Sequence, residues 1–265
     1  MKTNGVAFAA GGAKGFAHIP VLKLLEENNF KIEVVTGSSA GAIVAALYAL
    51  HGSWEKVYSE FAEAVDDQLP MMKKYLKKVE GPNLWSILNR SLVSTDEYYP
   101  FFKKLFGKRT FSDCNIKLGI VVYDILSFES ILVTEGFLVE TVMASSSVPA
   151  VFKPVQLAGT EVVDGGVTCP VPSIEARKLG ADFVISSDFV KEKSNQPKDQ
   201  LELLYFLDRW KEKYIIDEER SKSDLVISHP VKYQWYEFEN YEKIYLEALE
   251  HINRRRNNIE NFIRR

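Results

Sequence analysis

The chain has 265 residues and a formal net charge of −3. This length suits one large α/β domain with a buried core and is short for two complete domains. Hydrophobic residues make up 46% and charged residues 26%, as in ordinary soluble globular proteins, so neither disorder nor a fibrous class is indicated. The slightly acidic balance gives no electrostatic argument for a nucleic-acid partner. We therefore expect a single globular domain over residues 1–265.

The cysteines and the N-terminal segment give no sign of a disulfide-rich or metal-binding protein or of a signal peptide. Cys114 and Cys169 lie far apart and follow no metal-ligand spacing, so we expect no disulfide framework and no metal site. A reducing cytoplasm is the simplest location. The apolar stretch at residues 6–10 is shorter than the roughly 7–15 residues of a signal-peptide core and indicates a first buried strand. No apolar run approaches the roughly 18 residues of a transmembrane helix.

The first fifty residues alternate between strand and helix patterns. Residues 5–10 form an apolar run that ends in Gly-Gly, and residues 21–28 have helical apolar spacing. Residues 32–36 are β-branched, as in a strand, and residues 40–50 are rich in Ala and Leu, as in a helix. This order predicts a mostly parallel sheet covered by helices.

Residues 53–110 have a different pattern and are expected to be mostly helical. Ser94 and Glu97 have the spacing of a capping box that opens one helix. The apolar residues of this segment, such as Met71, Met72 and Trp85, permit two interpretations. They belong either to a helical layer packed on the sheet, which is the simpler interpretation, or to a cap whose apolar inner face holds a fatty chain.

The remaining strands are expected at 116–123, 130–133, 182–187 and 224–228, and the remaining helices at 137–144, 173–179, 201–219 and 241–263. A polar linker covers residues 191–200. Residues 200–265 are expected to form a peripheral, mostly helical extension. The last helix carries Arg254, Arg255 and Arg256. A basic amphipathic helix can lie on an anionic membrane, so peripheral membrane contact is the alternative to a purely cytoplasmic location. Acidic residues share the segment and favour a solvated face.

A nucleophile motif stands at the end of the second predicted strand. The segment Gly37-Ser38-Ser39-Ala40-Gly41 fits G-x-S-x-G and lies where that strand gives way to a helix. A sharp turn there exposes the central serine, and the flanking glycines relieve crowding. The helix that begins at Ala40 would place N-terminal N–H groups beside the serine oxygen, where they stabilise negative charge. Ser39 is therefore the candidate nucleophile.

A glycine-rich loop follows the first predicted strand. Its backbone N–H groups, at Gly11, Gly12, Ala13 and Lys14, could cradle a phosphate or stabilise an oxyanion. The loop lacks the G-K-[ST] of a Walker P-loop and does not match the dinucleotide pattern G-x-G-x-x-G. Since adjacent parallel strands end at the same edge of a sheet, we expect this loop to face Ser39.

A carboxylate for the serine is available at Asp164, which starts an Asp-Gly-Gly turn after Val162-Val163. It is a candidate general base, and a plain Asp-Gly hairpin turn is the alternative. A Ser–His–Asp triad in the α/β-hydrolase chain order would need His229 or His251, both in the peripheral extension. His18 lies near the glycine-rich loop and is expected to pack or cap there. A Ser39–Asp164 dyad is therefore favoured over a triad.

The segments AAGGAKGFAH, GSSAG and DGG, in this order, resemble the patatin-like phospholipases, particularly their compact bacterial members. The likeness extends to ASSSVPAVFKPV at 144–155 and covers roughly residues 5–190. It implies a three-layer α/β sandwich with a mostly parallel central sheet flanked by helices. It also implies Ser39 as nucleophile, Asp164 as its base, an oxyanion loop at residues 11–14 and no metal cofactor. The implied activity is that of a phospholipase A, lysophospholipase or esterase on lipid or other carboxylic esters.

Three positions depart from the family pattern. Ala10 stands where a glycine is usual, Lys14 replaces the usual arginine, and Pro20 replaces a common glycine. Proline is tolerated only in the first turn of a helix, so the helix that contains Pro20 is expected to start late or kink. Three alternatives to the dyad hydrolase stay open: a Ser–His–Asp esterase, a transferase that passes the acyl group to an alcohol, and a catalytically weak regulatory or binding protein.

Overall fold

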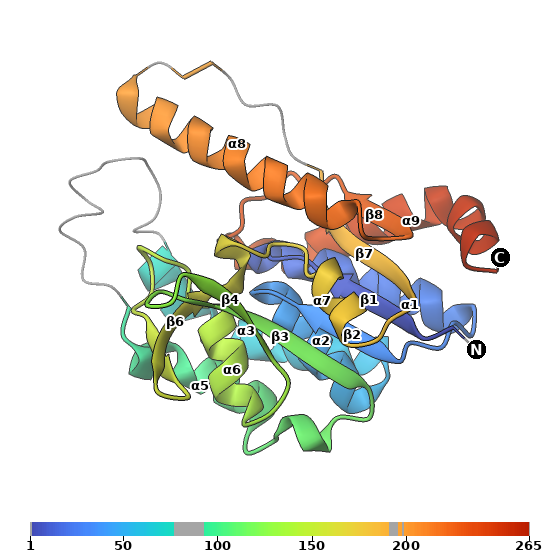
Figure 1. Ribbon diagram of the computed structural model, residues 1–265, viewed down its shortest axis with the longest axis horizontal. Coiled ribbons are helices and arrows are strands. Elements are labelled where there is room, and N and C mark those ends of the chain that lie inside the picture. Colours follow the sequence, from blue (N-terminus) through green and yellow to red (C-terminus); the bar gives the residue numbers. More distant parts are fainter. Residues whose placement is uncertain (1, 77–92, 191–195, 198, 265) are drawn as a thin grey trace.

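The structure is a computed structural model that describes residues 2–76, 93–190, 196–197 and 199–264 (Figure 1). Within these residues eight strands form one sheet, in the order β5-β6-β3-β2-β1-β7-β8, and β4 pairs with β3. The strands are β1 (Asn4–Phe8), β2 (Val34–Gly37), β3 (Lys117–Asp124), β4 (Glu129–Val133), β5 (Val155–Leu157), β6 (Thr160–Asp164), β7 (Phe183–Phe189) and β8 (Leu225–His229).

The sheet is mostly parallel, as the sequence predicts. Strands β3, β2, β1, β7 and β8 pair in parallel, whereas β4, β5 and β6 are antiparallel additions at the β3 side. On β3, Ile120 pairs with both Gly37 of β2 and Val133 of β4, so β2 and β4 lie on opposite edges. Further along β3, the same residues pair with both β4 and β6, so these two strands also lie on opposite edges of β3. β6 therefore lies on the edge that β2 occupies.

Helices cover both faces of the sheet. The α-helices are α1 (Ile19–Glu27), α2 (Ala40–His51), α3 (Trp54–Leu76), α5 (Thr95–Phe106), α6 (Leu138–Ser145), α7 (Ser173–Lys178), α8 (Gln200–Arg220) and α9 (Tyr241–Ile263). Short 3-10 helices are η1 (Gly12–His18), η3 (Phe111–Asp113), η4 (Gly165–Val167) and η5 (Phe238–Asn240). One face carries α1, α2, α3, α5, α6 and α9 in a thick layer, and the other carries α7 with α8 outside it (Figure 1).

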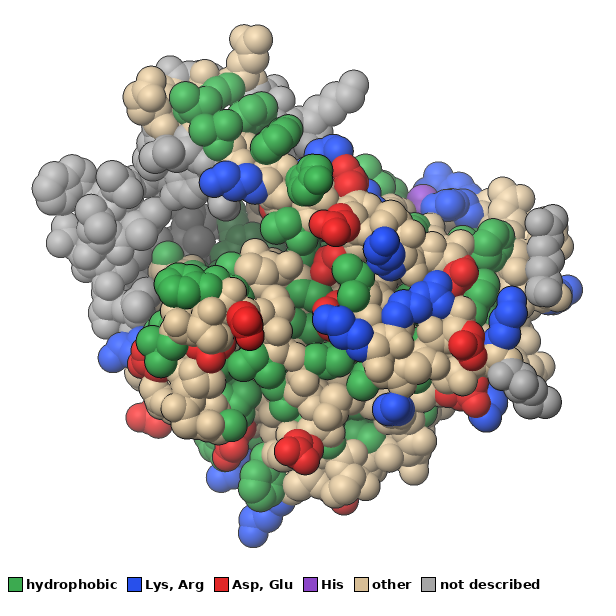
Figure 2. All heavy atoms as spheres, in the orientation of Figure 1, with side chains coloured by type: hydrophobic (Ala, Val, Ile, Leu, Met, Phe, Trp, Pro, Cys, Tyr) green, Lys and Arg blue, Asp and Glu red, His purple; other side chains and the backbone are tan. Residues whose placement is uncertain are grey.

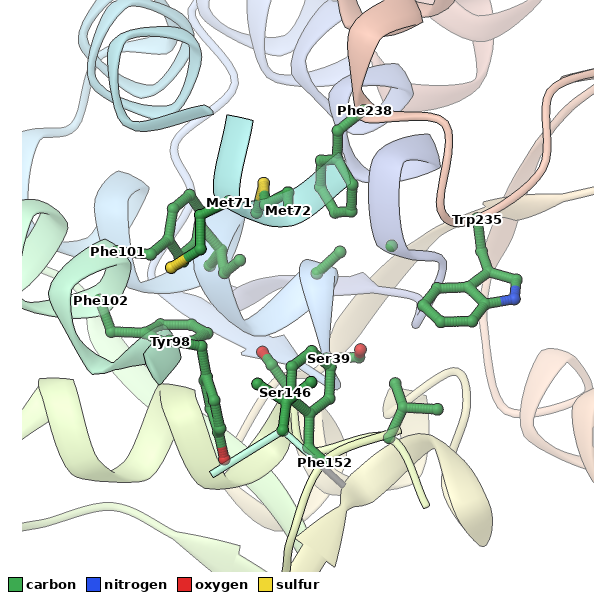
Figure 3. A pocket seen from close by; sticks show the side chains of 15 residues that line it. Ser39, Met71, Met72, Tyr98, Phe101, Phe102, Ser146, Phe152, Trp235 and Phe238 are labelled. Atoms are coloured by element: carbon green, nitrogen blue, oxygen red, sulfur yellow. The ribbon is translucent and has the colours of Figure 1, made fainter. Parts of the chain in front are cut away.

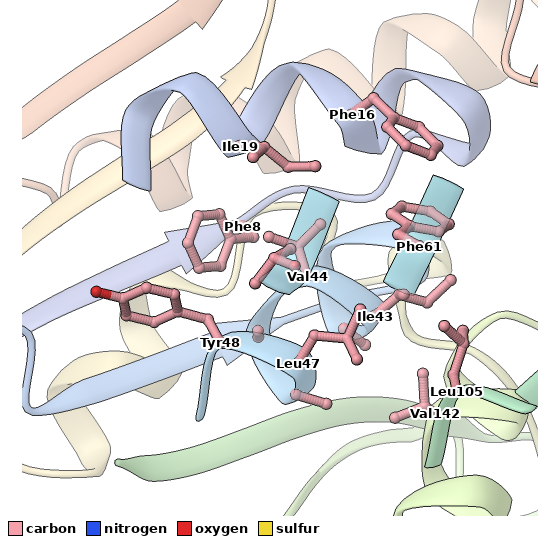
Figure 4. Packing of buried hydrophobic residues seen from close by; sticks show 14 of the residues in the cluster. Phe8, Phe16, Ile19, Ile43, Val44, Leu47, Tyr48, Phe61, Leu105 and Val142 are labelled. Carbon is pink, nitrogen blue, oxygen red and sulfur yellow. The ribbon is translucent and has the colours of Figure 1, made fainter. Parts of the chain in front are cut away.

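The side chains of β1 show why the sheet is buried on both faces. Val6 and Phe8 belong to the large core beneath the thick helical layer, and Ala7, between them, belongs to a smaller core under α7. This alternation follows the two-residue period of a strand. Figure 4 shows Phe8 of β1 and Val44 and Leu47 of α2 packed in the large core. A strand with apolar residues on both sides is typical of a parallel sheet.

Most of the expected elements are present, with small shifts at their ends. The capping box of Ser94 and Glu97 is confirmed at the start of α5. Pro20 neither delays nor kinks its helix, because α1 begins at Ile19 and the proline lies in its first turn. The interpretation of residues 200–265 as peripheral was wrong, because β8 extends the sheet and α9 packs on η1 and α1. The β5–β6 hairpin and η1 were not predicted.

The surface shows mixed charge. On the face drawn in Figure 2, basic and acidic side chains are interspersed, and no large basic patch appears. Arg256 of α9 pairs with Glu27 and Glu260, so one of the C-terminal arginines is held within the fold. None of the described helices combines the length and the apolar character that crossing a membrane requires.

Candidate active site

The turn between β2 and α2 holds Ser39 in a backbone conformation that non-glycine residues rarely adopt. Its φ is 53° and its ψ is −124°, a strained combination that costs about 1–3 kcal/mol. The glycines on either side make room for the turn. A Cβ on Gly41 would lie 2.1 Å from the carbonyl oxygen of Phe8, and one on Gly37 would lie 2.3 Å from the oxygen of Gly41. The G-x-S-x-G pattern is thus explained by close backbone packing.

Neighbouring segments hold this turn in place. The Ser38 hydroxyl donates to the carbonyl of Cys169 at 2.6 Å. The Ser39 amide donates to the Ser145 hydroxyl at 3.0 Å, and that hydroxyl donates to the carbonyl of Val121 at 2.7 Å. These bonds attach the turn to α6, β3 and the segment after Asp164. They over-determine the strained conformation, as is common at functional sites.

The register of the sheet brings Asp164 to this turn. Gly37 at the end of β2 pairs with Ile120 of β3, and Asp164 at the end of β6 pairs with Val122 of the same strand. β2 and β6 run in opposite directions along one edge of β3, so their ends meet about 7 Å apart, the length of two strand residues. The Asp-Gly-Gly segment is not a hairpin turn, because it leaves β6 and enters η4. The two ends deliver Ser39 and Asp164 to one place.

The environment of Asp164 suits a base. Its side chain is buried, and Oδ1 accepts a hydrogen bond of 2.7 Å from the Gly166 amide. Burial raises the pKa of Asp164 to about 6, while hydrogen bonds from the Ser39 side chain and the Gly166 amide act in the opposite direction. A buried carboxylate therefore faces the serine hydroxyl, with basicity increased toward neutral pH.

The backbone amides of the glycine-rich loop differ in whether they already donate a hydrogen bond within the protein. Ala13 N–H donates to the carbonyl of Trp235 at 2.7 Å, and Lys14 N–H donates to Gly11 at 3.1 Å. Within the described residues, the amides of Gly11, Gly12 and Ala40 have no hydrogen-bond partner. Gly12 requires its φ of 56° and also its lack of a side chain, because a Cβ would lie 2.2 Å from the Trp235 oxygen.

The family departures leave this loop intact. Ala10 has a negative φ, so its methyl group brings no left-handed strain, and its amide donates to the carbonyl of Pro170 at 2.9 Å. That methyl group packs beside Gly166, where a Cβ would come within 2.8 Å of it. Lys14 lies on the wall of a cavity that includes Ser39, with its ammonium 6.0 Å from the ring centre of Phe189.

Two cavities of different character meet at Ser39. One is narrow and apolar, and Figure 3 shows the side chains of Met71, Met72 and Phe152 around it, near Ser39. The other has a volume of about 570 Å³, carries charged groups and includes Asp164 and the glycine-rich loop. A bound molecule with an apolar tail and a polar end would therefore have one part in each cavity, with the junction between them beside the hydroxyl of Ser39.

The segment expected to be a layer or a cap contributes residues both to the core and to the wall of the apolar cavity. Buried residues of α3 and α5, such as Phe61 and Phe106, belong to the core, whereas Met71, Phe101 and Phe102 line the apolar cavity. The rest of that prediction, residues 77–92 with Trp85, lies outside the described residues. The role of Phe152 was not anticipated from the sequence, although it lies in the segment 144–155 that carries the resemblance.

None of the four histidines lines either cavity that reaches Ser39. His18 and His229 are fully buried and contact the Ser187 hydroxyl, and His51 pairs with Glu60 at 3.0 Å. The remaining one, His251, lies on α9 beside the ring of His229. The structure thus brings together the predicted serine and aspartate, and it places the histidines elsewhere.

One group of potential metal ligands occurs among the described residues, at Cys169, Glu175 and Glu219. The Cys169 thiol donates to Glu175 at 3.2 Å, and Glu219 accepts from the Val171 amide at 2.6 Å. Burial raises the pKa of Glu219 to about 8. The cluster is buried and hydrogen-bonded within itself, and none of its residues lines the cavities at Ser39.

Comparisons with known proteins point to one family. The family model for patatin-like phospholipases matches residues 6–176. Lysophospholipase NTE1 of Pyricularia oryzae is 25% identical over 213 residues, which are 79% of this chain and 14% of that protein. An uncharacterised NTE family protein of Mycobacterium tuberculosis is 26% identical over 181 residues, 68% of this chain and 47% of that protein. The chain thus spans less than half the length of these relatives.

Among solved structures, VipD from Legionella pneumophila superimposes with a TM-score of 0.56. The alignment has 15% sequence identity and covers 97% of this chain and 67% of that one. At this identity the likeness concerns the fold, including the segments outside the matched family region.

Proposed function

Because this chain belongs to the patatin-like phospholipase family, we propose that it is a serine hydrolase that cleaves lipid or other carboxylic esters through a Ser39–Asp164 dyad. The observation that carries the proposal is the buried Asp164 carboxyl facing the Ser39 hydroxyl where an apolar and a polar cavity meet. The cytoplasm as location and peripheral contact with membrane lipids stay predictions from the sequence.

The first half of the reaction transfers the acyl group to the serine. Asp164 accepts the Ser39 proton as the hydroxyl oxygen attacks the ester carbonyl. The negative charge that develops on the carbonyl oxygen is stabilised by the available amides of Gly11 and Gly12, with Ala40 at the start of α2 as a further donor. The ester C–O bond then breaks, and the departing alcohol takes the proton from Asp164. An acyl-enzyme on Ser39 remains.

The second half returns the enzyme to its resting state. Asp164 accepts a proton from a water molecule, and the resulting nucleophile attacks the acyl carbonyl. The same amides stabilise the second tetrahedral intermediate, and Ser39 leaves with the proton that Asp164 had taken. In this proposal the acyl chain occupies the apolar cavity lined by Met71, Met72 and Phe152, and the leaving group occupies the polar cavity. No step requires a metal ion.

The proposal is tested with a fluorophosphonate probe and with p-nitrophenyl esters of graded chain length beside phospholipid vesicles. The wild type should be labelled and should release acid, and Ser39→Ala should lose both. Ser146→Ala removes another serine from the cavity wall and should still be labelled. Asp164→Asn should stay folded and lose turnover by about 10³-fold or more.

Four outcomes would contradict parts of this proposal. Undiminished labelling of Ser39→Ala would exclude this serine as the nucleophile. A His251→Gln or His229→Gln variant as inactive as Ser39→Ala would favour a triad. No turnover of any ester by the wild type would favour a binding role. Transfer of the acyl group to an added alcohol, in preference to water, would identify a transferase.

A further inference from the structure

Behind the glycine-rich loop lies a set of buried polar side chains that the proposed mechanism does not use. His18 at the end of η1, Ser187 on β7 and His229 at the end of β8 are each fully buried. Three segments distant in the sequence therefore place polar groups in one region of the core. The rings of Phe8 and Phe189 pack on His18, with centroids 5.5 and 4.9 Å away. Most buried polar groups in an apolar setting are hydrogen-bonded, so the partners of these three side chains can be assigned.

The direction of these hydrogen bonds follows from the acceptors. His18 Nε2 lies 3.0 Å from the carbonyl oxygen of Ala9, and a carbonyl can only accept, so Nε2 carries the proton. Burial lowers the pKa of His18 to about 4, so the ring is neutral and Nδ1 is bare. The Ser187 hydroxyl, 2.7 Å away, must then donate its one proton to His18 Nδ1.

The same reasoning assigns the position of the proton on the second histidine, His229. With its proton committed, the Ser187 oxygen can only accept from His229 Nε2, which lies 3.1 Å away. Burial also lowers the pKa of His229 below its ordinary value, so this ring is neutral too. Its Nδ1 is left bare, in agreement with the finding that this atom is buried and has no hydrogen-bond partner among the described residues. The chain of donors therefore runs His229 to Ser187 to His18 to Ala9.

This chain ends at the point where the glycine-rich loop begins. Ala9 follows the last residue of β1, and His18 is the last residue of η1, so their hydrogen bond closes the intervening loop into a ring. The ring of Phe189 lies between the two sides, packed on His18 and against Gly11, where a Cβ would come within 2.4 Å of it. The hydrogen bond from Ala13 to Trp235 holds the middle of the loop.

We infer that His18, oriented by Ser187 and His229, is a positioning residue that holds the Gly11 and Gly12 amides in place as oxyanion donors. This inference rests on the proposed function. A donor stabilises a developing charge fully only when its orientation is fixed before the reaction. A chain with one possible direction has a single low-energy arrangement, which a mixture of tautomers would not have. The loop itself has two adjacent glycines and would otherwise be permissive.

Kinetics of folded variants test the inference. In His18→Leu the donor to Ala9 is lost, and we expect kcat to fall roughly 10- to 100-fold with little change in KM, because the oxyanion exists only near the transition state. His18→Gln keeps an N–H donor and should recover most of the lost kcat. His51→Gln, a histidine outside the chain, should behave as wild type. A folded His18→Leu that keeps wild-type kcat would overturn the inference, as would a glutamine variant no better than the leucine variant.

If His18→Leu does not fold, Ser187→Ala removes the middle of the chain and leaves the bond to Ala9. We expect kcat to fall again with KM unchanged, and an unchanged kcat in this variant would equally overturn the inference. The reading of kcat presupposes that wild type turns over and Ser39→Ala does not. A failure of that first comparison contradicts the proposed function, not the hydrogen-bond chain.

A spectroscopic test does not depend on activity. Nitrogen-15 NMR of the histidine rings should show His18 and His229 as neutral Nε2–H tautomers, and His18 should stay neutral from about pH 5 to 8. The ring of His18 in Ser187→Ala should lose the shift of a hydrogen-bonded Nδ1. A proton on Nδ1 of either ring, or titration of His18 near its ordinary pKa, would overturn the assigned direction even in an active enzyme.

Discussion

Burial of Asp164 sets the pH range in which the proposed dyad can operate. Burial raises the pKa of this carboxyl to about 6, and a general base acts only when unprotonated. We expect kcat/KM to fall about tenfold for each pH unit below 6 and to level off above about pH 7. A pH-stat assay with an uncharged ester measures this directly. A profile that is flat from about pH 5 to 8, or one that follows a group near 4 or near 8, would contradict the assignment of Asp164 as base.

The same shift has a cost in stability. Since the folded protein holds this proton more tightly than the unfolded chain does, the contribution of Asp164 to stability is present below its ordinary pKa of 3.8 and is lost as the pH rises through about 6. The carboxylate is therefore charged and buried under the conditions where the enzyme would act. Sites that keep such a group exchange stability for activity.

Single residues of the site differ in how far the sequence reveals them. Ser39 could be predicted because its motif combines local chemistry with a strand-to-helix junction. Asp164 was recognisable only as a candidate, because its meeting with Ser39 depends on the pairing of β2 and β6 with the same strand. The amide of Ala13 was expected to face the site and instead binds Trp235, from a distant part of the chain. Such long-range contacts leave no local pattern.

At the scale of elements, one short segment joins the loops of the site. Residues 169–173 follow η4, and three of their carbonyl groups accept hydrogen bonds from β2 and from the loops that follow β1 and β2. Pro170 accepts from Ala10, Cys169 from Ser38, and Pro172 from Thr36. The turn after β2 and the loop after β1 are thus fixed to the segment that follows Asp164. A displacement of this segment would move the nucleophile, the oxyanion loop and the base together.

Helix α8 anchors this segment through Glu219. Its Oε2 accepts from the Val171 amide at 2.6 Å, and its backbone carbonyl accepts from the Ser173 hydroxyl. Glu219→Ala leaves the Val171 amide buried without an acceptor, which should cost about 1–3 kcal/mol of the free energy of unfolding. Glu219→Gln keeps an acceptor and should cost much less. Urea unfolding at neutral pH distinguishes them, and equal losses in both variants would contradict the anchoring role.

The same urea-unfolding experiment, repeated over a range of pH, tests the protonation of Glu219. Burial raises the pKa of Glu219 to about 8, so its contribution to stability is fully present below the ordinary value of 4.5 and is lost as the pH rises through about 8. The glutamine variant has no proton to lose. The free energy of unfolding of wild type should therefore decline relative to Glu219→Gln between these limits, and a constant difference would be inconsistent with a buried, protonated Glu219.

Short elements account for most of what the sequence missed. β5 has three residues and β6 five, and only Val162 and Val163 gave an apolar signal, so the hairpin did not stand out. η1 was read as loop because Gly12 and Gly15 argue against a regular helix. By contrast, α2 and β3 were predicted with nearly correct ends, because long periodic runs define them. Two of the elements at the site, η1 and β6, thus have weak patterns, whereas α2, which begins beside the nucleophile, has a strong one.

At the scale of the whole molecule, the C-terminal helix closes the layer behind the site. The buried residues of α9 recur at helical spacing, as Tyr241, Ile244, Ala248, Ile252 and Ile259. The apolar residues of this stripe alternate with charged residues, arginines and glutamates among them, which indicated a solvated helix. α9 packs on α1 and on η1, whose first residues belong to the glycine-rich loop. The C-terminal segment is therefore part of the core that supports the site.

Tyr241 is where this support can be measured. Its ring packs on Phe16 of η1, with centroids 4.8 Å apart, and its hydroxyl donates to Asp66 of α3 at 3.0 Å. Phe16 is itself stacked on Phe61 at 4.2 Å (Figure 4). Loss of the whole ring should destabilise the fold by about 3–5 kcal/mol, as for other large-to-small core changes, whereas loss of the hydroxyl alone should cost about 0.5–1.5 kcal/mol.

Tyr241→Ala and Tyr241→Phe therefore form a matched pair, compared by urea unfolding and by kcat of the folded protein. Because the ring supports η1 from behind and does not line either cavity, we expect the alanine variant to lose stability first and to keep KM. Its kcat should fall only if loss of the ring also displaces the glycine-rich loop. If Tyr241→Ala proved as stable as Tyr241→Phe, α9 would contribute little to the core, in keeping with the peripheral extension that the sequence predicts.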